Sequence, residues 1–166
     1  MESSLYLLDA NTFMTPARTY YSFKFTTSYW DFLLSKAEEG AICSIDKVFI
    51  EIKKGNDELK LWAESQFEDY FISTNTPEII SNYGKIVLWV HNEDQYSQTA
   101  KDEFMEADNA DAWLLATALT KNLFIVTFEQ FNPDIKRKIP IPNVCHAFNI
   151  QYCNLFNMLE ELEFSF

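Results

Sequence analysis

The sequence predicts an α/β fold, a three-layer α/β/α sandwich around a central, mainly parallel sheet. Two apolar, strand-like runs at residues 5–8 and 123–127 are separated by a long stretch with helical patterning. Strands separated by helices are typical of parallel sheets, because a parallel strand is reached by a helical crossover. Glycine and proline are scarce, with 3 and 5 residues, which argues against a turn-rich all-β protein.

The first half of the chain contains one clear strand followed mainly by helices. Pro16 opposes an early helix, so we expect a loop after the first strand. Ser28 could cap a helix that Gly40 ends, and Ser44 is a good N-cap for the next helix. The elements expected here are a strand over 5–8, a loop over 9–21, helices over 28–40, 44–54 and 57–70, and a strand over 71–72.

The second half repeats this alternation of helices and strands. Pro77 suits the first turn of a helix. Asp108 is expected to cap the helix that opens at Asp111, with Asn109 as the alternative cap, and Asp108 is also kept as a candidate site acid. The elements expected here are helices over 78–90, 97–106 and from 111, a strand over 123–127, a polar loop, an extended segment near 144–148, and a helix over 154–162.

Size and composition predict one domain, residues 1–166, in the cytoplasm. The chain has 166 residues, of which 48% are hydrophobic, so a full core can form. Residues 1–4 lack the basic region of a secretory signal, and no apolar run approaches the ~20 residues of a membrane span. The three cysteines are scattered and odd in number, which favours reduced thiols.

The formal net charge of −12 is unusual for a protein that binds nucleic acid through an overall positive charge. It fits an acidic metal site within an acidic surface, and it equally fits a protein whose partner is basic. Charge alone leaves both interpretations open.

Two acids directly follow the two predicted strands. Asp9 comes after Tyr6-Leu7-Leu8, and Glu129 comes after Phe124-Ile125-Val126-Thr127-Phe128. The carboxyl ends of parallel strands share one edge of the sheet, where α/β proteins bind ligands. Converging carboxylates repel each other unless a cation joins them. An Asx-turn at the strand end is the alternative role for Asp9.

Two further acids lie on predicted helices. Asp111 shares a helix face with Leu114, Leu115 and Ala118, and a buried carboxylate is costly unless it is paired or binds a metal. Its alternative role is to complement the helix dipole. Glu51 flanks an apolar helix face, and its alternative is an ordinary solvated helix acid.

In combination, these acids resemble the motifs of the PIN-domain nuclease family, which includes toxins of bacterial toxin–antitoxin pairs. The matching stretches are Leu7-Leu8-Asp9-Ala10-Asn11, Val48-Phe49-Ile50-Glu51-Ile52, Asp111-Ala112-Trp113-Leu114-Leu115-Ala116 and Ile125-Val126-Thr127-Phe128-Glu129. Two departures stand out: Ala10 lies where the family often has Thr, and Glu129 lies where Asp is common. Neither removes a ligand oxygen, but both could shift the geometry of a bound metal.

The resemblance implies a ribonuclease that uses Mg²⁺ or Mn²⁺. Asp9, Glu51 and Asp111 would hold the ion, and Glu129 would hold a second ion or an ordered water. The implied partners are an RNA substrate, an antitoxin protein and a second copy of the chain, with no membrane.

Several residues near these acids are candidates for contact with RNA. Asn11 and Thr127 could position water or a phosphate oxygen, and Tyr20 and Tyr21 could stack on bases. A compact basic cluster follows Glu129 and could contact phosphate, although a solvated loop is its alternative reading. The cluster consists of Lys136, Arg137 and Lys138.

Two other functions compete with the ribonuclease. The same fold with a weak site could act as a protein-binding module through its acidic surface. An aspartyl phosphotransferase with Asp9 as nucleophile is the third reading. It is disfavoured because the late strand ends in Thr127-Phe128-Glu129 rather than in the expected lysine.

Overall fold

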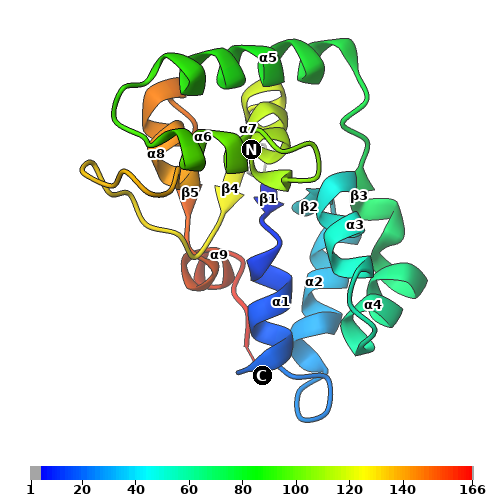
Figure 1. Ribbon diagram of the computed structural model, residues 1–166. Coiled ribbons are helices and arrows are strands. Elements are labelled where there is room, and N and C mark those ends of the chain that lie inside the picture. The colour runs from blue at the N-terminus through cyan, green and yellow to red at the C-terminus, as the bar shows by residue number, and fades with distance from the viewer. Residues whose placement is uncertain (1–4, 166) are drawn as a thin grey trace.

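The computed structural model describes residues 5–165, within which five strands form one parallel sheet (Figure 1). The strand order is β3-β2-β1-β4-β5, and the parallel sheet flanked by helices confirms the predicted α/β fold class. The strands are β1 (Tyr6–Leu8), β2 (Ile42–Ile45), β3 (Phe71–Ile72), β4 (Phe124–Val126) and β5 (Tyr152–Cys153). Residues 1–4, where no secretory signal was expected, lie outside the described range.

The central strand β1 pairs with β2 on one side and with β4 on the other. Along the chain, β2 and β3 are added on one side of β1, and β4 and β5 are then added on the other. The boundary between β1 and β4 is therefore a topological switch point. Leu8 is in register with Val126, so the residues that follow β1 and β4 lie side by side. The sheet thus brings Asp9 next to Thr127 at its carboxyl edge.

Helices cover both faces of the sheet. Figure 1 shows α5, α7 and α8 on one side of the row of strands, and α1, α2 and α9 on the other. The α-helices are α1 (Asn11–Arg18), α2 (Ser28–Glu38), α3 (Asp46–Lys53), α4 (Glu58–Trp62), α5 (Pro77–Asn92), α6 (Gln98–Phe104), α7 (Ala110–Lys121), α8 (Ile141–Phe148) and α9 (Leu155–Glu161). Within residues 5–165, no helix has the length and apolar character to cross a membrane.

The segment after β1 is a helix, so the loop expected for residues 9–21 was wrong. Helix α1 contains Pro16 in its interior. Proline has no N–H to donate to the carbonyl of Thr12, four residues earlier. The buried hydroxyl of Tyr29 donates to that carbonyl instead, over 2.9 Å. A tertiary hydrogen bond thus replaces the one that the helix cannot make.

Strand β2 was not expected from the sequence, and neither proposed serine cap is a cap. Ser44 lies inside β2, fully buried, and its hydroxyl donates to the carbonyl of Leu8 over 2.7 Å. Helix α3 follows at once, with Ile45 at its N-cap. Ser28 is the first helical residue of α2, and no side chain caps that helix.

The helical stretch expected over 57–70 is present but changes type along its length. Helix α4 passes into a π-helix over Ala63–Phe67 and then a 3₁₀ turn over Glu68–Tyr70. Leu59, Trp62, Ala63 and Phe67 of this stretch are buried, whereas Gln66 is exposed.

The extended segment expected near 144–148 was wrong, because these residues belong to α8. The buried residues Ile141, Val144 and Cys145 follow helical spacing, and Asn149 ends the helix in the left-handed conformation with φ +59°. The nearby strand is β5, only two residues long. The helices expected over 78–90, 97–106, from 111 and over 154–162 are confirmed as α5, α6, α7 and α9.

Candidate metal centre

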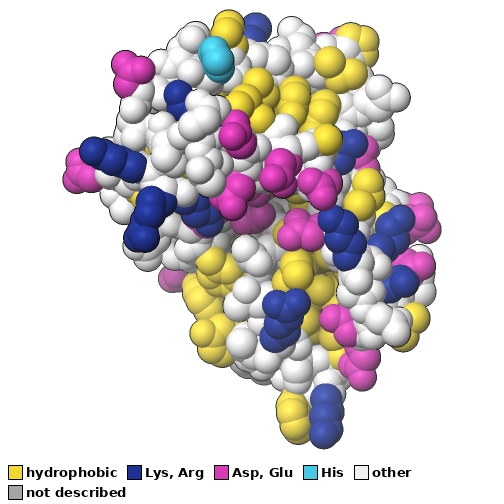
Figure 2. Space-filling model, in the orientation of Figure 1, with side chains coloured by type: hydrophobic (Ala, Val, Ile, Leu, Met, Phe, Trp, Pro, Cys, Tyr) yellow, Lys and Arg dark blue, Asp and Glu magenta, His cyan; other side chains and the backbone are white. Residues whose placement is uncertain are grey.

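Among residues 5–165, seven acidic side chains line one pocket of about 500 Å³, which is called the acidic pocket below. They come from the ends of β1 and β4, from helices α3, α6 and α7, and from the loop before α7. Figure 2 shows acidic side chains gathered in a band across this face, with Lys and Arg side chains to either side. The acids are Asp9, Glu51, Glu103, Glu106, Asp108, Asp111 and Glu129.

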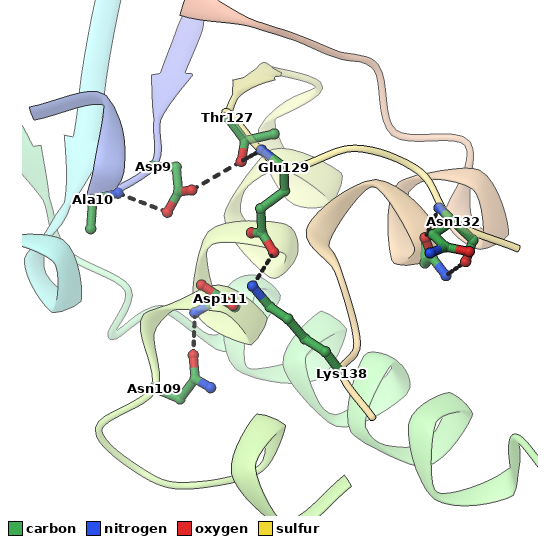
Figure 3. Close-up of polar contacts among 9 residues, drawn as sticks. Asp9, Ala10, Asn109, Asp111, Thr127, Glu129, Asn132 and Lys138 are labelled. Atoms are coloured by element: carbon green, nitrogen blue, oxygen red, sulfur yellow. Dashed lines mark hydrogen bonds and ion pairs between the residues drawn. The ribbon is translucent and has the colours of Figure 1, made fainter. Parts of the chain in front are cut away.

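Asp9 is 4% exposed, and two hydrogen bonds hold its carboxylate. The backbone N–H of Ala10 donates to Oδ1 over 2.7 Å, and the hydroxyl of Thr127 donates to Oδ2 over 3.0 Å (Figure 3). Burial, and then the charge of Glu129, raises the pKa of Asp9 to about 7, although both hydrogen bonds oppose the shift. Asp9 therefore exchanges a proton near neutral pH when no cation is bound.

Asp111 lies in the first turn of α7 and lines the same pocket. The side chain of Asn109 caps this helix by accepting from the Asp111 N–H over 2.9 Å, so Asn109 is the cap rather than Asp108. Burial raises the pKa of Asp111 well above its ordinary value, and the charges of Asp9 and Glu129 raise it further. The charges of Asp9 and Glu129 therefore disfavour ionisation of Asp111.

Glu129 lies at the rim of the pocket, where Lys138 enters it. The ammonium of Lys138 is 2.9 Å from Oε1 of Glu129 (Figure 3), and the Glu129 side chain is 15% exposed. The backbone N–H of Glu129 donates to the hydroxyl of Thr127 over 3.1 Å. Thr127 thus connects the two strand-end acids, since the same hydroxyl donates to Asp9.

Glu51 is half-buried on α3 and faces the same pocket, so it is not simply a solvated helix acid. Burial raises its pKa; Lys54, one turn later, lowers it, and Asp108 raises it again. Asp108 is exposed and pairs with Lys54 over 3.5 Å. Lys54 and Lys138 are the two cations that line the pocket.

The other predicted site residues are divided between the pocket and the surface. Asn11 lines the pocket, and Thr127 contributes indirectly because its hydroxyl donates a hydrogen bond to the Asp9 carboxylate. Lys136 and Arg137 are exposed and do not line it. Tyr20 and Tyr21 do not line it either, and the Tyr21 ring stacks on Tyr29 at 4.4 Å.

Sequence reasoning missed three charged residues that line the pocket: Lys54, Glu103 and Glu106. Asp108, which was expected to be a cap and was kept as a candidate site acid, lines it as well. The dense run of acids over residues 102–111 was the available signal. No sequence signal pointed to Lys54, because its approach to the pocket depends on how α3 packs against α7.

The chemistry of the pocket fits a hard divalent cation. Mg²⁺ and Mn²⁺ prefer oxygen ligands, and closely spaced carboxylates with raised pKa values are stabilised by a cation. As the side chains stand, no group of three or more His, Cys, Asp or Glu within residues 5–165 is placed to hold an ion. Glu129 instead faces Lys138.

Comparison with known proteins places the chain in a family and identifies its fold. The profile described as "Domain of unknown function (DUF4411)" matches residues 6–166. No curated protein sequence matches the chain.

Two solved structures have a similar fold. A chain of VapBC2 from Rickettsia felis, bound to a promoter DNA fragment, aligns with a TM-score of 0.52 and 16% identity over 90% of this chain and 98% of that one. A chain of VapBC-1 from nontypeable Haemophilus influenzae aligns with a TM-score of 0.50 and 14% identity over 90% and 97%. Both are VapBC toxin–antitoxin structures, and VapC is a PIN-domain nuclease. The expected resemblance to PIN domains is confirmed at the level of the fold.

Proposed function

The chain belongs to the DUF4411 family, a domain of unknown function, and we propose that it is a metal-dependent endoribonuclease of the toxin type. The proposed substrate is single-stranded RNA, and the bond broken is a phosphodiester. The PIN-like fold supports a nuclease in general, while the metal and the RNA belong to the proposal.

One observation carries the proposal: the buried carboxyl group of Asp9 and the half-buried one of Asp111 line one pocket with Glu129 at the carboxyl edge of the sheet, and burial raises the pKa of both aspartates. Keeping two such groups close together costs folding free energy. Because this arrangement of carboxyl groups does not stabilise the fold, we attribute it to the binding of a ligand that carboxylates attract, such as a cation.

Each acid has a proposed role. Asp9, Glu51 and Asp111 would hold Mg²⁺ or Mn²⁺, and Glu129 would hold a second ion or an ordered water. When bound, such a cation supplies Lewis acidity, which acidifies a water molecule and offsets charge on the phosphate. The hydroxyl of Thr127 fixes the Asp9 carboxylate through its 3.0 Å hydrogen bond, and the amide of Asn11 faces the pocket, where it could orient a phosphate oxygen.

The proposed partners follow from the same comparison. The similar structures are VapBC complexes, which supports an antitoxin protein as the regulator of this chain. A second copy of the chain and a cytoplasmic location complete the proposal. Lys136 and Arg137, exposed in the loop after Glu129, are proposed to contact phosphates further along the RNA.

A protein-binding module with a weak site is the second candidate. The ion pair between Lys138 and Glu129 favours it, because an internal ammonium already neutralises part of the acid cluster. A net charge of −12 also suits a basic protein partner.

Cleavage of unstructured RNA by the purified protein separates the two candidates. We expect turnover with Mn²⁺ and none with EDTA. Asp111→Asn should remove turnover while the protein stays folded, because the change replaces a charge without altering the side chain's size. Glu160→Gln, on the exposed face of α9, is the matched control and should cleave like the wild type. Equal inactivity of the wild type and Asp111→Asn would favour the binding module.

A further inference from the structure

Phe131 and His146 form a stacked pair of rings on the surface. Their centroids are 3.8 Å apart and their planes differ by only 5°. Phe131 is nevertheless 41% exposed. One face of the phenyl ring is covered by the imidazole, so much of the exposed area belongs to the other face and the edges. The pair therefore presents one aromatic face to solvent while the imidazole supports the other.

The pair is held in place from both sides. His146 lies on α8, and its Nε2 is 3.1 Å from the hydroxyl of Tyr152 on the edge strand β5. Next to Phe131, the backbone of Asn132 is fixed at both its polar groups: its N–H donates to Asn143 Oδ1 over 3.0 Å, and its carbonyl accepts from Asn143 Nδ2 over 2.8 Å (Figure 3). Asn143 itself is 5% exposed, and its amide also donates to Tyr96. Contacts with α8, with β5 and with the loop that contains Tyr96 thus hold the Phe131–His146 pair and the adjacent backbone in place.

The ring lies beside the proposed cleavage site. Phe131 follows Glu129 by two residues and lines two hollows, of about 370 Å³ and about 410 Å³. Glu129 also lines both of them. The amide side chains of Gln130 and Asn157 face the larger hollow. A group seated against Phe131 would therefore be within reach of hydrogen-bonding side chains and next to the acidic pocket.

We propose that Phe131 is a stacking platform for one nucleobase of a single-stranded RNA, adjacent to the acidic pocket. This inference rests on the proposed ribonuclease function and names the part of the substrate that the loop recognises. Bases stack on aromatic side chains irrespective of sequence, because every base has a π-face, and unpaired bases are the ones accessible to such a ring. The exposed cations Lys136 and Arg137 lie in the same loop and could meet the backbone phosphates that flank the base.

The test measures whether a base of the RNA contributes to binding through the Phe131 ring. Fluorescein-labelled RNA of about twelve nucleotides is titrated in EDTA at low salt, and anisotropy gives the dissociation constant. Single abasic nucleotides are then scanned along the strand. In the wild type, we expect one position at which loss of the base weakens binding by roughly tenfold.

Phe131→Leu keeps an apolar side chain but removes the flat ring, so the penalty at that position should fall to about twofold or less. Phe131→Tyr should restore the penalty. Phe25→Leu changes an 81% exposed phenylalanine that lines neither hollow, and it should behave as wild type. Melting temperatures confirm that each variant folds.

Three results would overturn the inference: the same abasic penalty in Phe131→Leu as in the wild type, no position with a penalty, or no RNA binding by the wild type. A ring that serves a protein partner instead gives no base-dependent penalty. Because the titration contains neither metal nor cleavage, its result is independent of the ribonuclease assay. If the protein cleaves RNA but Phe131→Leu does not change the abasic penalty, only this inference fails. If Phe131→Leu reduces the penalty but the protein does not cleave RNA, the ribonuclease proposal fails and an RNA-binding surface remains.

Discussion

At Asp9, burial and the charge of Glu129 disfavour the ionised carboxylate, so folding stability should depend on pH. The pKa is raised from 3.8 to about 7 in the folded protein, and the raised value means that the folded state binds the proton more tightly. In EDTA, the unfolding free energy should therefore fall as pH rises from about 4 to about 7, by on the order of 2–4 kcal/mol.

Asp9→Asn should flatten this dependence and stabilise the protein at pH 8 in EDTA. Asn can still accept from the N–H of Ala10, and its amide can donate to the hydroxyl of Thr127. Asp134→Asn, an exposed acid outside the pocket, is the control. Urea unfolding of all three proteins at pH 5 and pH 8 provides the measurement. A wild-type stability that rises over this range would mean that the carboxylate is not disfavoured as described.

Lys138 would compete with the proposed metal ion for Glu129, since its ammonium is 2.9 Å from the Glu129 carboxylate. Removing this positive charge should strengthen Mn²⁺ binding, by about threefold to tenfold at low salt. We therefore expect Lys138→Ala to bind Mn²⁺ more tightly than the wild type, and Lys136→Ala, in the same loop but outside the pocket, to match the wild type. Weaker binding in Lys138→Ala would show that the lysine supports the site rather than competes for it.

Helix α1 depends on a hydrogen bond from outside the helix. Without the Tyr29 hydroxyl, the carbonyl of Thr12 loses the donor that replaces the missing N–H of Pro16. Tyr29→Phe should lower the unfolding free energy by ~1–3 kcal/mol. In a Pro16→Ala background the helix supplies its own donor, so the same change should cost less than half as much. Equal costs in the two backgrounds would show that the two groups do not share this role.

Elements were predictable where local signals agreed with the tertiary structure. Helices α5, α6, α7 and α9 are long or clearly capped, for example by Ser97 and Asn154, and the sequence was sufficient to place them. Strand β2 was hidden because its polar residue, Ser44, is satisfied by Leu8 of the neighbouring strand. Pro16 led to the wrong prediction of a loop because the hydroxyl group that compensates for its missing N–H belongs to Tyr29, which is distant in sequence. Contacts between elements decided both cases.

For the whole molecule, the order of the acids along the chain predicted which side chains would line one pocket. Two strand-end acids must share an edge in a parallel sheet, so Asp9 and Glu129 could be brought together from the sequence. Lys138 was a candidate because it follows Glu129 closely in the sequence, but Lys54 could not be predicted, because its approach depends on helix packing. The roles of the acids as metal ligands and the extent of the domain over 1–166 stay predictions.

Net charge and local charge also act on different scales. The molecule carries −12, yet exposed cations such as Lys136 and Arg137 lie in the loop after Glu129. Long-range repulsion of RNA is screened within about 8–10 Å at physiological salt, whereas a local phosphate contact persists. An acidic protein can therefore still bind RNA at one place on its surface.

Calorimetric titration of Mn²⁺ at neutral pH tests the central claim most directly, since it needs no knowledge of the RNA or of a protein partner. The account predicts saturable binding by the wild type and affinity lower by about tenfold or more in both Asp9→Asn and Asp111→Asn, because each change removes a carboxylate from the acidic pocket. Glu160→Gln, an exposed acid elsewhere, should bind as the wild type does. Equal heats from the wild type and the two pocket variants, or no binding by the wild type, would contradict it.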